Sequence, residues 1–156
     1  MEIRRAVKDD IDSLVELMER VELTGKLGRS REISVYRAQR VVKDDKRIIL
    51  VFEDFSRLLG YVGISGFDED KNAERFVDIR HYACINWVGV DPDFRHLDIG
   101  SRLVQSCDEI AKGFGKIGIW TDCREKVIPF YTGNGYEVKG CYDDWGGNRF
   151  VMAKSF

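Results

Sequence analysis

The sequence predicts a single mixed α/β domain. The chain has 156 residues, which is the size of one domain. Hydrophobic residues make up 44% of the chain, and a chain of this length buries roughly 70% of its unfolded surface. Apolar runs typical of strands alternate with segments of helical periodicity. We therefore expect residues 1–156 to form one folded domain.

The first half of the chain shows both patterns. Apolar residues from Ile11 to Val21 recur at helical spacing behind the possible N-cap pair Asp9 and Asp10. Short runs rich in β-branched and aromatic residues indicate strands. The expected elements are a strand over 3–7, a helix from 11, a loop over 24–31, a weaker helix over 32–42, and a hairpin of strands over 47–53 and 58–67.

The second half contains the clearest helix of the sequence. Between Gly100 and Phe114, six apolar residues fall on one helical face, and Gly113 and Gly115 end the pattern. Before this helix, a charged loop over 68–74 precedes a long expected strand over 76–90, whose apolar parity shifts between Ile79 and Tyr82 and so predicts a bulge. The remaining expected elements are strands over 116–121, 136–142 and 148–154 and a short helix over 125–132.

Charge and hydropathy exclude several functions. The 25 basic and 27 acidic residues leave a net charge of -2, which is not the basic footprint of a nucleic-acid-binding protein. No apolar stretch approaches the roughly 20 residues that span a bilayer, and the segment Met1–Arg5 lacks the apolar run of a signal peptide. We expect a cytoplasmic protein with neither nucleic acid nor membrane as a partner.

The cysteines indicate neither a zinc site nor a disulfide framework. The four residues are widely spaced and form no CxxC pair. We expect free and mostly buried thiols and no bound metal. The four are Cys84, Cys107, Cys123 and Cys141.

The segment from Val88 to Ser101 has the pattern of an anion site. An expected strand runs through a short loop into the helix that starts near Gly100. The first N–H groups of a helix have no partner within it, and the helix dipole adds positive charge there. Gly100 allows close approach of an anion, and Arg95 and Arg102 add formal charge. A pyrophosphate would fit, although an ordinary strand-to-helix turn explains the same residues.

The same segment resembles the acetyl-CoA signature of the GNAT superfamily of N-acetyltransferases, V-x-P-x-x-[RQ]-x-x-G-x-[GA], and the order of elements matches too. The resemblance implies a mixed, mostly antiparallel sheet of about seven strands flanked by about four helices, with a splayed strand pair forming the acyl-CoA cleft. It implies that the strand lines the pantetheine arm of acetyl-CoA and that the helix start holds the pyrophosphate. The implied cofactor-binding residues are Val88, Gly89, Val90, Arg95, His96, Leu97, Asp98, Ile99, Gly100 and Ser101.

Two residues depart from the family pattern. Asp98 replaces the first glycine of the signature and brings a negative charge near the expected phosphates, so either its side chain points to solvent or binding is weakened. We favour the first, because Gly100 and Arg95 are retained. Arg124 stands where many relatives carry an asparagine that binds the cofactor arm. It either reaches a phosphate or is a solvated surface arginine.

A second motif, Phe130 to Tyr136, resembles the C-terminal pattern of the family. In that family the tyrosine at the position of Tyr131 protonates the departing CoA thiolate. A phenol suits this role because it is neutral at pH 7 and can donate a proton. The alternative is that Tyr131 is only a core aromatic.

The base that deprotonates the acceptor amine is open. In the family this group commonly sits on the long central strand, where His81 and Asp78 fall. Glu53 and Asp122 lie at other strand ends. His81 has the most suitable unperturbed pKa and is our possible base, but a single strand histidine is more often structural.

We therefore predict an acetyl-CoA-dependent N-acetyltransferase that transfers an acetyl group to a primary amine of a small molecule or peptide by direct attack. A backbone N–H near Val90 would polarise the thioester carbonyl. A homodimer is possible, as often in the family. The main alternative is a non-catalytic acyl-CoA-binding regulatory module of the same fold. A Rossmann-type domain is disfavoured, because the anion loop follows several strands rather than the first.

Overall fold

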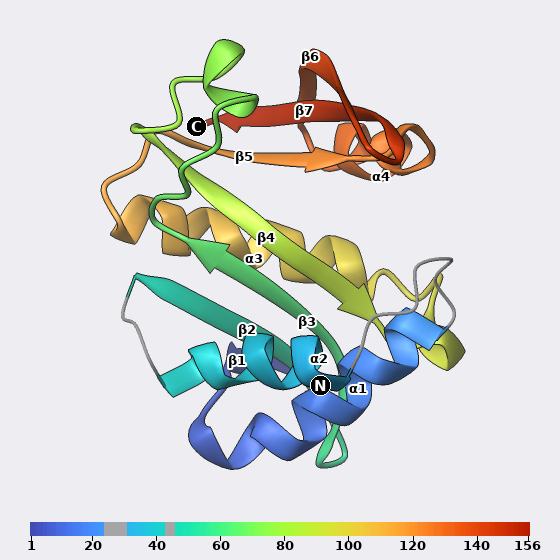
Figure 1. Cartoon of the computed structure of the whole chain (residues 1–156). Coiled ribbons are helices and arrows are strands. Elements are labelled where there is room, and N and C mark those ends of the chain that lie inside the picture. The colour runs from blue at the N-terminus through green and yellow to red at the C-terminus, as the bar shows by residue number, and fades with distance from the viewer. Residues whose placement is uncertain (24–30, 43–45) are drawn as a thin grey trace. The chain divides into compact units, whose positions relative to one another are not determined.

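The computed structural model of the chain describes residues 1–23, 31–42 and 46–156 (Figure 1). The strands are β1 (Glu2–Arg5), β2 (Arg47–Asp54), β3 (Arg57–Ser65), β4 (Tyr82–Val90), β5 (Gly118–Cys123), β6 (Glu137–Asp144) and β7 (Gly147–Ser155). The α-helices are α1 (Ile11–Leu23), α2 (Arg31–Ala38), α3 (Ile99–Gly113) and α4 (Ile128–Gly133). Most of the loop predicted over 24–31 lies outside the described residues.

The seven strands form one mixed sheet in the order β1-β2-β3-β4-β5-β7-β6. The pairs β1–β2, β5–β7 and β6–β7 are antiparallel, whereas β4 and β5 are parallel. The predicted mixed sheet of about seven strands with about four helices is confirmed. No helix in the described ranges is long and apolar enough to cross a membrane.

By its internal contacts the chain divides into two compact units. The first contains Met1–Ile64 and Trp87–Ser106, and the second contains Ser65–Asn86 and Cys107–Phe156. The boundary therefore falls within β4 and within α3. Organisation as one domain over residues 1–156 stays a prediction.

The core of the first unit lies between the helices α1 and α2, which lie side by side, and the strands β2 and β3 (Figure 1). The amphipathic pattern of α1 accounts for this, since its apolar residues Leu14 and Met18 are fully buried. Arg4 of β1 donates to Glu53 (2.6 Å) and to Asp10 (2.8 Å), and so ties β1 to β2 and to the turn before α1.

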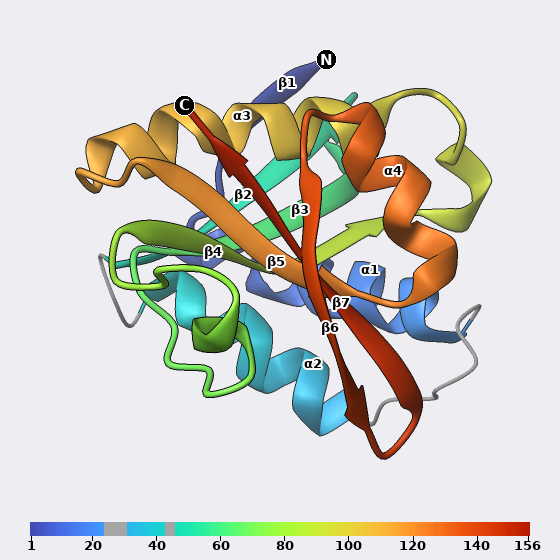
Figure 2. The same cartoon turned by 90° about the horizontal axis from the view of Figure 1, so that it is seen from above.

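The second unit contains the hairpin of β6 and β7, seen in red in Figure 2, and β5 beside it. A core cluster of this unit joins Cys84 of β4 and Trp120 of β5 to Val77 and Ile79 from the segment before β4. The predicted helix over 100–114 is confirmed as α3. Its apolar residues are buried: Leu103 and Val104 belong to the first unit, and Cys107 and Ala111 belong to the second.

The long strand predicted over 76–90 is wrong in its first part. Residues 73–75 form a 3-10 turn and β4 begins only at Tyr82, so the predicted bulge does not occur there. The backbone N–H of Val77 donates to the carbonyl of Ala73 (3.0 Å), and that of Ile79 donates to the carbonyl of Val77 (2.9 Å). Apolar and polar residues therefore alternate here as they would in a strand, although the buried apolar residues lie in local turns.

Candidate active site

The loop that follows β4 is fixed at its first residue. The backbone N–H of Asp91 donates to the carbonyl of Leu59 in β3 (2.8 Å). The carboxylate of Asp91 is 1% exposed and caps the next 3-10 turn, Pro92–Phe94, by accepting from the N–H of Asp93 (3.0 Å). Arg20 of α1 (2.9 Å) and Arg57 of β3 (3.3 Å) supply the positive charge that a buried carboxylate requires.

Two residues of the loop that are not glycine adopt the left-handed backbone conformation. His96 has φ +65° and Asp98 has φ +66°, and both are exposed. Asp98 directly precedes α3 and its carbonyl accepts the N–H of Arg102. The left-handed backbone explains why the family signature carries glycine at the position of Asp98, since glycine adopts it without steric cost. The exposure agrees with the expectation that Asp98 points to solvent.

Asp98→Gly is expected to raise the free energy of unfolding by up to about 1 kcal/mol, because the steric cost of the left-handed conformation disappears. Acetyl-CoA should bind equally well or more tightly, because a negative charge leaves the loop. Thermal melting and calorimetric titration measure the two effects. Asp98→Asn is the matched control, since asparagine removes the charge but keeps a side chain. A clear loss of affinity in Asp98→Gly would show that the carboxylate makes a needed contact.

Small residues on β3 and β4 set the position of the α3 N-terminus. A Cβ atom on Gly60 would lie 2.9 Å from Leu103 and 3.0 Å from Ile99, so the first turns of α3 pack directly on the β3 backbone. A Cβ atom on Gly89 would lie 2.5 Å from the ring of Tyr61. Gly89 is therefore required by packing, and only its backbone is available to a ligand.

The loop residues expected to contact the cofactor lie on the surface of the first unit. Arg95, Leu97 and the two left-handed residues are exposed, whereas Ile99 is buried and anchors the helix. The guanidinium Nε of Arg95 donates to the carbonyl of Val90 (3.4 Å), which bends this side chain back over the loop. The guanidinium of Arg102 lies 5.1 Å from the ring centre of Phe52.

Tyr131 belongs to the second unit and lies in α4. Its side chain is buried, and its ring makes edge contacts with Phe130 (5.0 Å between ring centres) and Tyr136 (5.5 Å). Burial raises the pKa of the phenol well above its ordinary value, and a hydrogen bond with the Thr121 side chain partly opposes the rise. Tyr131 is therefore a neutral proton donor at physiological pH.

Thr121 lies where the pairing of β4 with β5 ends. The parallel ladder joins Tyr82–Cys84 to Gly118–Trp120. At the next position, the hydroxyl of Thr121 donates to the carbonyl of Ile85 (3.0 Å). Sequence analysis did not single out Thr121. A polar residue inside the otherwise apolar run of β5 was the available signal, because a buried hydroxyl needs a partner.

Arg124 is held within the second unit. Its guanidinium makes two hydrogen bonds to the carboxylate of Asp144 (2.8 and 3.0 Å) and also donates to the carbonyls of Gly147 (3.2 Å) and Asn148 (3.4 Å). Arg124 therefore links the β6–β7 turn to the end of β5. The sequence analysis expected instead that it reaches a phosphate or is a solvated surface arginine. The Trp145 side chain in the same turn is fully exposed.

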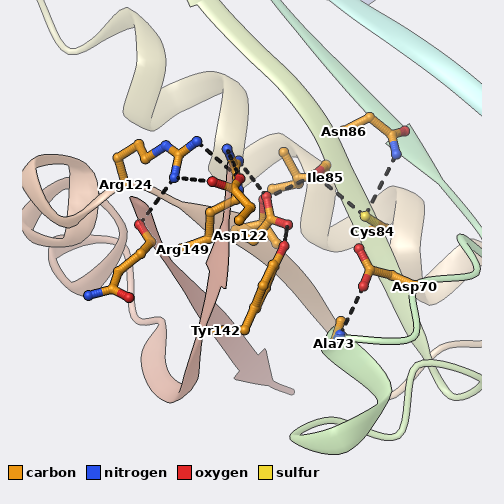
Figure 3. Close-up of polar contacts among 12 residues, drawn as sticks. Asp70, Ala73, Cys84, Ile85, Asn86, Asp122, Arg124, Tyr142 and Arg149 are labelled. Carbon is orange, nitrogen blue, oxygen red and sulfur yellow. Dashed lines mark hydrogen bonds and ion pairs between the residues drawn. The ribbon is translucent and has the colours of Figure 1, made fainter. Parts of the chain in front are cut away.

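Asp122, a candidate base, accepts two hydrogen bonds on β5 (Figure 3). The hydroxyl of Tyr142 donates to it (2.7 Å), as does the guanidinium of Arg149 (2.7 Å). Both donors occupy the oxygens of the Asp122 carboxylate. Glu53, another candidate base, is paired with Arg4 in the first unit.

His81 and Asp78 form an exposed pair before β4. The distance from His81 Nδ1 to Asp78 Oδ2 is 2.6 Å, and this hydrogen bond lowers the pKa of Asp78. His81 precedes the strand and lies four positions before Ile85, which is about 13 Å along an extended chain. The structure thus does not bring His81 to the position where Thr121 meets Ile85.

Three of the four thiols are buried, as predicted, and Cys141 is exposed; none of these four cysteines forms a disulfide bond. Burial raises the pKa of Cys84 well above its ordinary value, that of Cys107 to about 12 and that of Cys123 to about 11. These three thiols are protonated at neutral pH and are poor nucleophiles.

Comparison with known proteins identifies the family to which this chain belongs. A family model described as the acetyltransferase (GNAT) domain matches residues 44–138, more than half of the chain. The chain therefore belongs to the GNAT acetyltransferase family, as the signature around Arg95 and Gly100 predicted.

Three known proteins are similar to this chain in sequence or in fold. An uncharacterised N-acetyltransferase of Methanocaldococcus jannaschii is 29% identical over 154 residues, which cover 92% of this chain and 63% of that protein. The chain thus spans less than two thirds of that relative. Two solved structures share the fold: an aminoglycoside 6'-N-acetyltransferase complexed with coenzyme A (TM-score 0.76, 20% identity, 99% and 97% coverage) and a ribosomal-protein-alanine N-acetyltransferase from Brucella melitensis (0.76, 19%, 100% of both chains).

Proposed function

We propose that this chain transfers the acetyl group of acetyl-CoA to a primary amine of a small molecule or peptide, and that the amine attacks the thioester directly. The observation that carries this proposal is the loop before α3. Its left-handed residues, His96 and Asp98, lead the chain into the first turn of a 15-residue helix. The first N–H groups of such a helix have no partner within the helix and favour a pyrophosphate.

The proposed cofactor contacts come from the first unit. Backbone groups of Val88, Gly89 and Val90 would pair with the pantetheine arm, and a backbone N–H near Val90 would polarise the thioester carbonyl. The segment 95–101 would hold the pyrophosphate. The close packing of Ile99 and Leu103 on Gly60 supports this, because a rigidly seated helix start keeps its N–H groups in place.

The proposed general acid is Tyr131, in the second unit. Its burial keeps the phenol protonated. In the reaction the amine nitrogen bonds to the acetyl carbon, the carbon–sulfur bond breaks, and Tyr131 gives its proton to the departing sulfur. We assign no side chain as base, and the proton of the amine leaves through water.

Direct attack is favoured over a covalent acetyl-cysteine route. A thiol acts as a nucleophile only as its thiolate, and burial raises the pKa of Cys84, Cys107 and Cys123. We therefore propose a complex of enzyme, acetyl-CoA and amine as the reacting species.

The acceptor amine is tested with a panel of amines, two of which are chosen from the names of the similar structures. Kanamycin represents aminoglycosides, a peptide with N-terminal alanine represents ribosomal-protein termini, and spermidine and free amino acids represent other amines. Thiol release from acetyl-CoA gives the rate, and mass spectrometry of the acceptor identifies the product. Amine-dependent thiol release with an acetylated product supports the proposal. Tight acetyl-CoA binding without release for any acceptor would instead support the regulatory module.

Acetyl-CoA is expected to raise the thermal midpoint of the protein. A ligand that binds only the folded state at 100 times its Kd stabilises that state by about 2.7 kcal/mol. Differential scanning fluorimetry with increasing acetyl-CoA measures the shift, and pantetheine, which lacks the pyrophosphate, is the matched control ligand. Equal shifts with both ligands would contradict a pyrophosphate site at the start of α3.

A further inference from the structure

We propose that Arg37, Arg40 and Trp87 bind a negatively charged group of the acceptor, so that the acceptor is a primary amine that also carries a carboxylate or a phosphate. This inference deepens the proposed function and rests on it. All three residues belong to the first unit, and Trp87 directly precedes Val88, the first residue proposed to contact the pantetheine arm. Val90, near the proposed thioester, is three positions from Trp87, which is about 10 Å along a strand. An amine of the size of lysine covers this distance.

The ring of Trp87 is held against the sheet. A Cβ atom on Gly63 of β3 would lie 2.6 Å from this ring, so the ring rests directly on the β3 backbone. The same side chain packs against the core cluster of the first unit, which includes residues of α1 and α2. It is nevertheless only partly buried. Trp87 therefore provides a fixed aromatic surface that a ligand can reach.

Two guanidinium groups lie beside this one ring. The guanidinium carbon of Arg37 is 5.1 Å from the centre of the Trp87 ring, and that of Arg40 is 5.4 Å from it. The guanidinium of Arg40 also lies 5.0 Å from the ring centre of Tyr36 and donates a hydrogen bond to its hydroxyl (2.9 Å). Contacts between a guanidinium and aromatic rings hold its orientation. Two oriented positive charges thus share one aromatic ring.

Carboxylates of the protein balance these charges only in part. The guanidinium of Arg37 meets the carboxylate of Glu22 in α1 at 3.5 Å. Among the residues that the structure describes, Arg40 forms no ion pair, and its hydrogen bond goes to an uncharged hydroxyl. A guanidinium has five N–H donors, so most of those of Arg40 remain for a ligand. The missing partner of this pair of arginines is an anion.

The chemistry of the guanidinium group defines the anion as a carboxylate or a phosphate. Its planar N–H donors match the spacing of the oxygens in both groups. The apolar part of the same ligand can pack against the ring of Tyr36, which is 56% exposed. A second positive charge on the acceptor would instead be repelled by both arginines. We therefore expect amino acids or amino phosphates as acceptors, and not diamines or spermidine.

Two pairs of amines test this preference, because the members of each pair differ only in the anionic group. Lysine and cadaverine differ by a carboxylate, and O-phosphoethanolamine and ethanolamine differ by a phosphate. Thiol release at saturating acetyl-CoA should give a kcat/KM about tenfold or more higher for the anionic member of at least one pair, the effect of a charged hydrogen bond. The pair with the larger ratio identifies the anionic group. A ratio of one or less in both pairs would overturn the inference.

Substitution of Arg40 tests whether these residues cause the preference. Arg40→Gln should lower the larger ratio to within about threefold of one, through the KM of the acceptor, and leave the Kd of acetyl-CoA within about twofold. Arg40→Lys keeps the charge but loses the planar donors, so its ratio should fall between the two. Arg31→Gln is the matched control, since it removes the same charge from α2 and Arg31 is already paired with Glu19 (2.9 and 3.0 Å). An unchanged ratio in Arg40→Gln, or an equal fall in Arg31→Gln, would overturn the inference.

Binding separates this inference from the proposed function. Calorimetric titration of the four amines into the protein with bound CoA measures affinity without turnover. If no amine is acetylated, the proposed function fails, but tighter binding of the anionic amine that Arg40→Gln abolishes would still support the anion site. Equal binding of both members of each pair, or binding of neither, would overturn the inference. Acetylation of cadaverine and ethanolamine as fast as their anionic counterparts would overturn it too, and would leave the proposed function intact.

Discussion

Tyr131→Phe is expected to lower kcat by about 10² to 10⁴, the range for loss of a positioned general acid, while acetyl-CoA binding and folding barely change. The substitution removes one hydroxyl and keeps the ring that packs against Phe130 and Tyr136. The effect should fall on kcat because the phenol acts where negative charge develops on sulfur, and little in the ground state.

The rate of thiol release at saturating acetyl-CoA, together with the Kd of CoA from calorimetry, measures both parts of this prediction. Tyr136→Phe is the matched control. Tyr136 is also buried beside Tyr131, and among the described residues its hydroxyl has no hydrogen-bond partner. Its removal should leave kcat within about twofold. Unchanged turnover in Tyr131→Phe would remove Tyr131 from the mechanism, and equal losses of binding and turnover would make it a cofactor-packing residue.

Gly100→Val should abolish detectable acetyl-CoA binding in a protein that remains folded. Gly100 lies in the first turn of α3, and a branched side chain there would occupy the space through which a pyrophosphate approaches the helix N–H groups. Calorimetric titration with CoA measures the loss, and circular dichroism confirms the fold.

Gly113→Val is the matched control for Gly100→Val. Gly113 ends the same helix, and a Cβ atom on it would meet no atom within 4 Å. Both substitutions change helix propensity by the same residue types, so only the position relative to the proposed site differs. Undiminished CoA binding by folded Gly100→Val would show that the anion site is assigned wrongly.

Much of the fold was predictable because hydrophobic periodicity reports directly on burial. The apolar stripe of α3 predicted one buried face, and Leu103, Cys107 and Ala111 are fully buried. The same reasoning failed over residues 76–81. There the buried apolar residues Val77 and Ile79 alternate as in a strand, but their N–H groups bond within local turns. Periodicity shows that a residue is buried and does not show which backbone partner it has.

The candidate site was predictable where its residues are contiguous. The signature located the loop from Arg95 to Gly100, yet the left-handed backbone of Asp98, which explains the family glycine, needed the structure. Contacts between residues that are far apart in the sequence could not be predicted. Arg124 and Asp144 are 20 residues apart, and Thr121 and Ile85, which are joined by a hydrogen bond, are 36 residues apart. Their pairing depends on tertiary geometry that local spacing does not encode.

The central claim, direct acetyl transfer to an amine, is tested most directly with acetyl-CoA that carries an isotopic label in its acetyl group. The enzyme is mixed with this substrate and the most active amine, and mass spectrometry follows the label on the amine and on the intact protein. The account predicts one labelled acetyl group on the amine for each thiol released and none on the protein. Label on Cys84, Cys107 or Cys123 that precedes label on the amine would contradict direct attack, and acetyl-CoA that binds without any label reaching an amine would contradict catalysis.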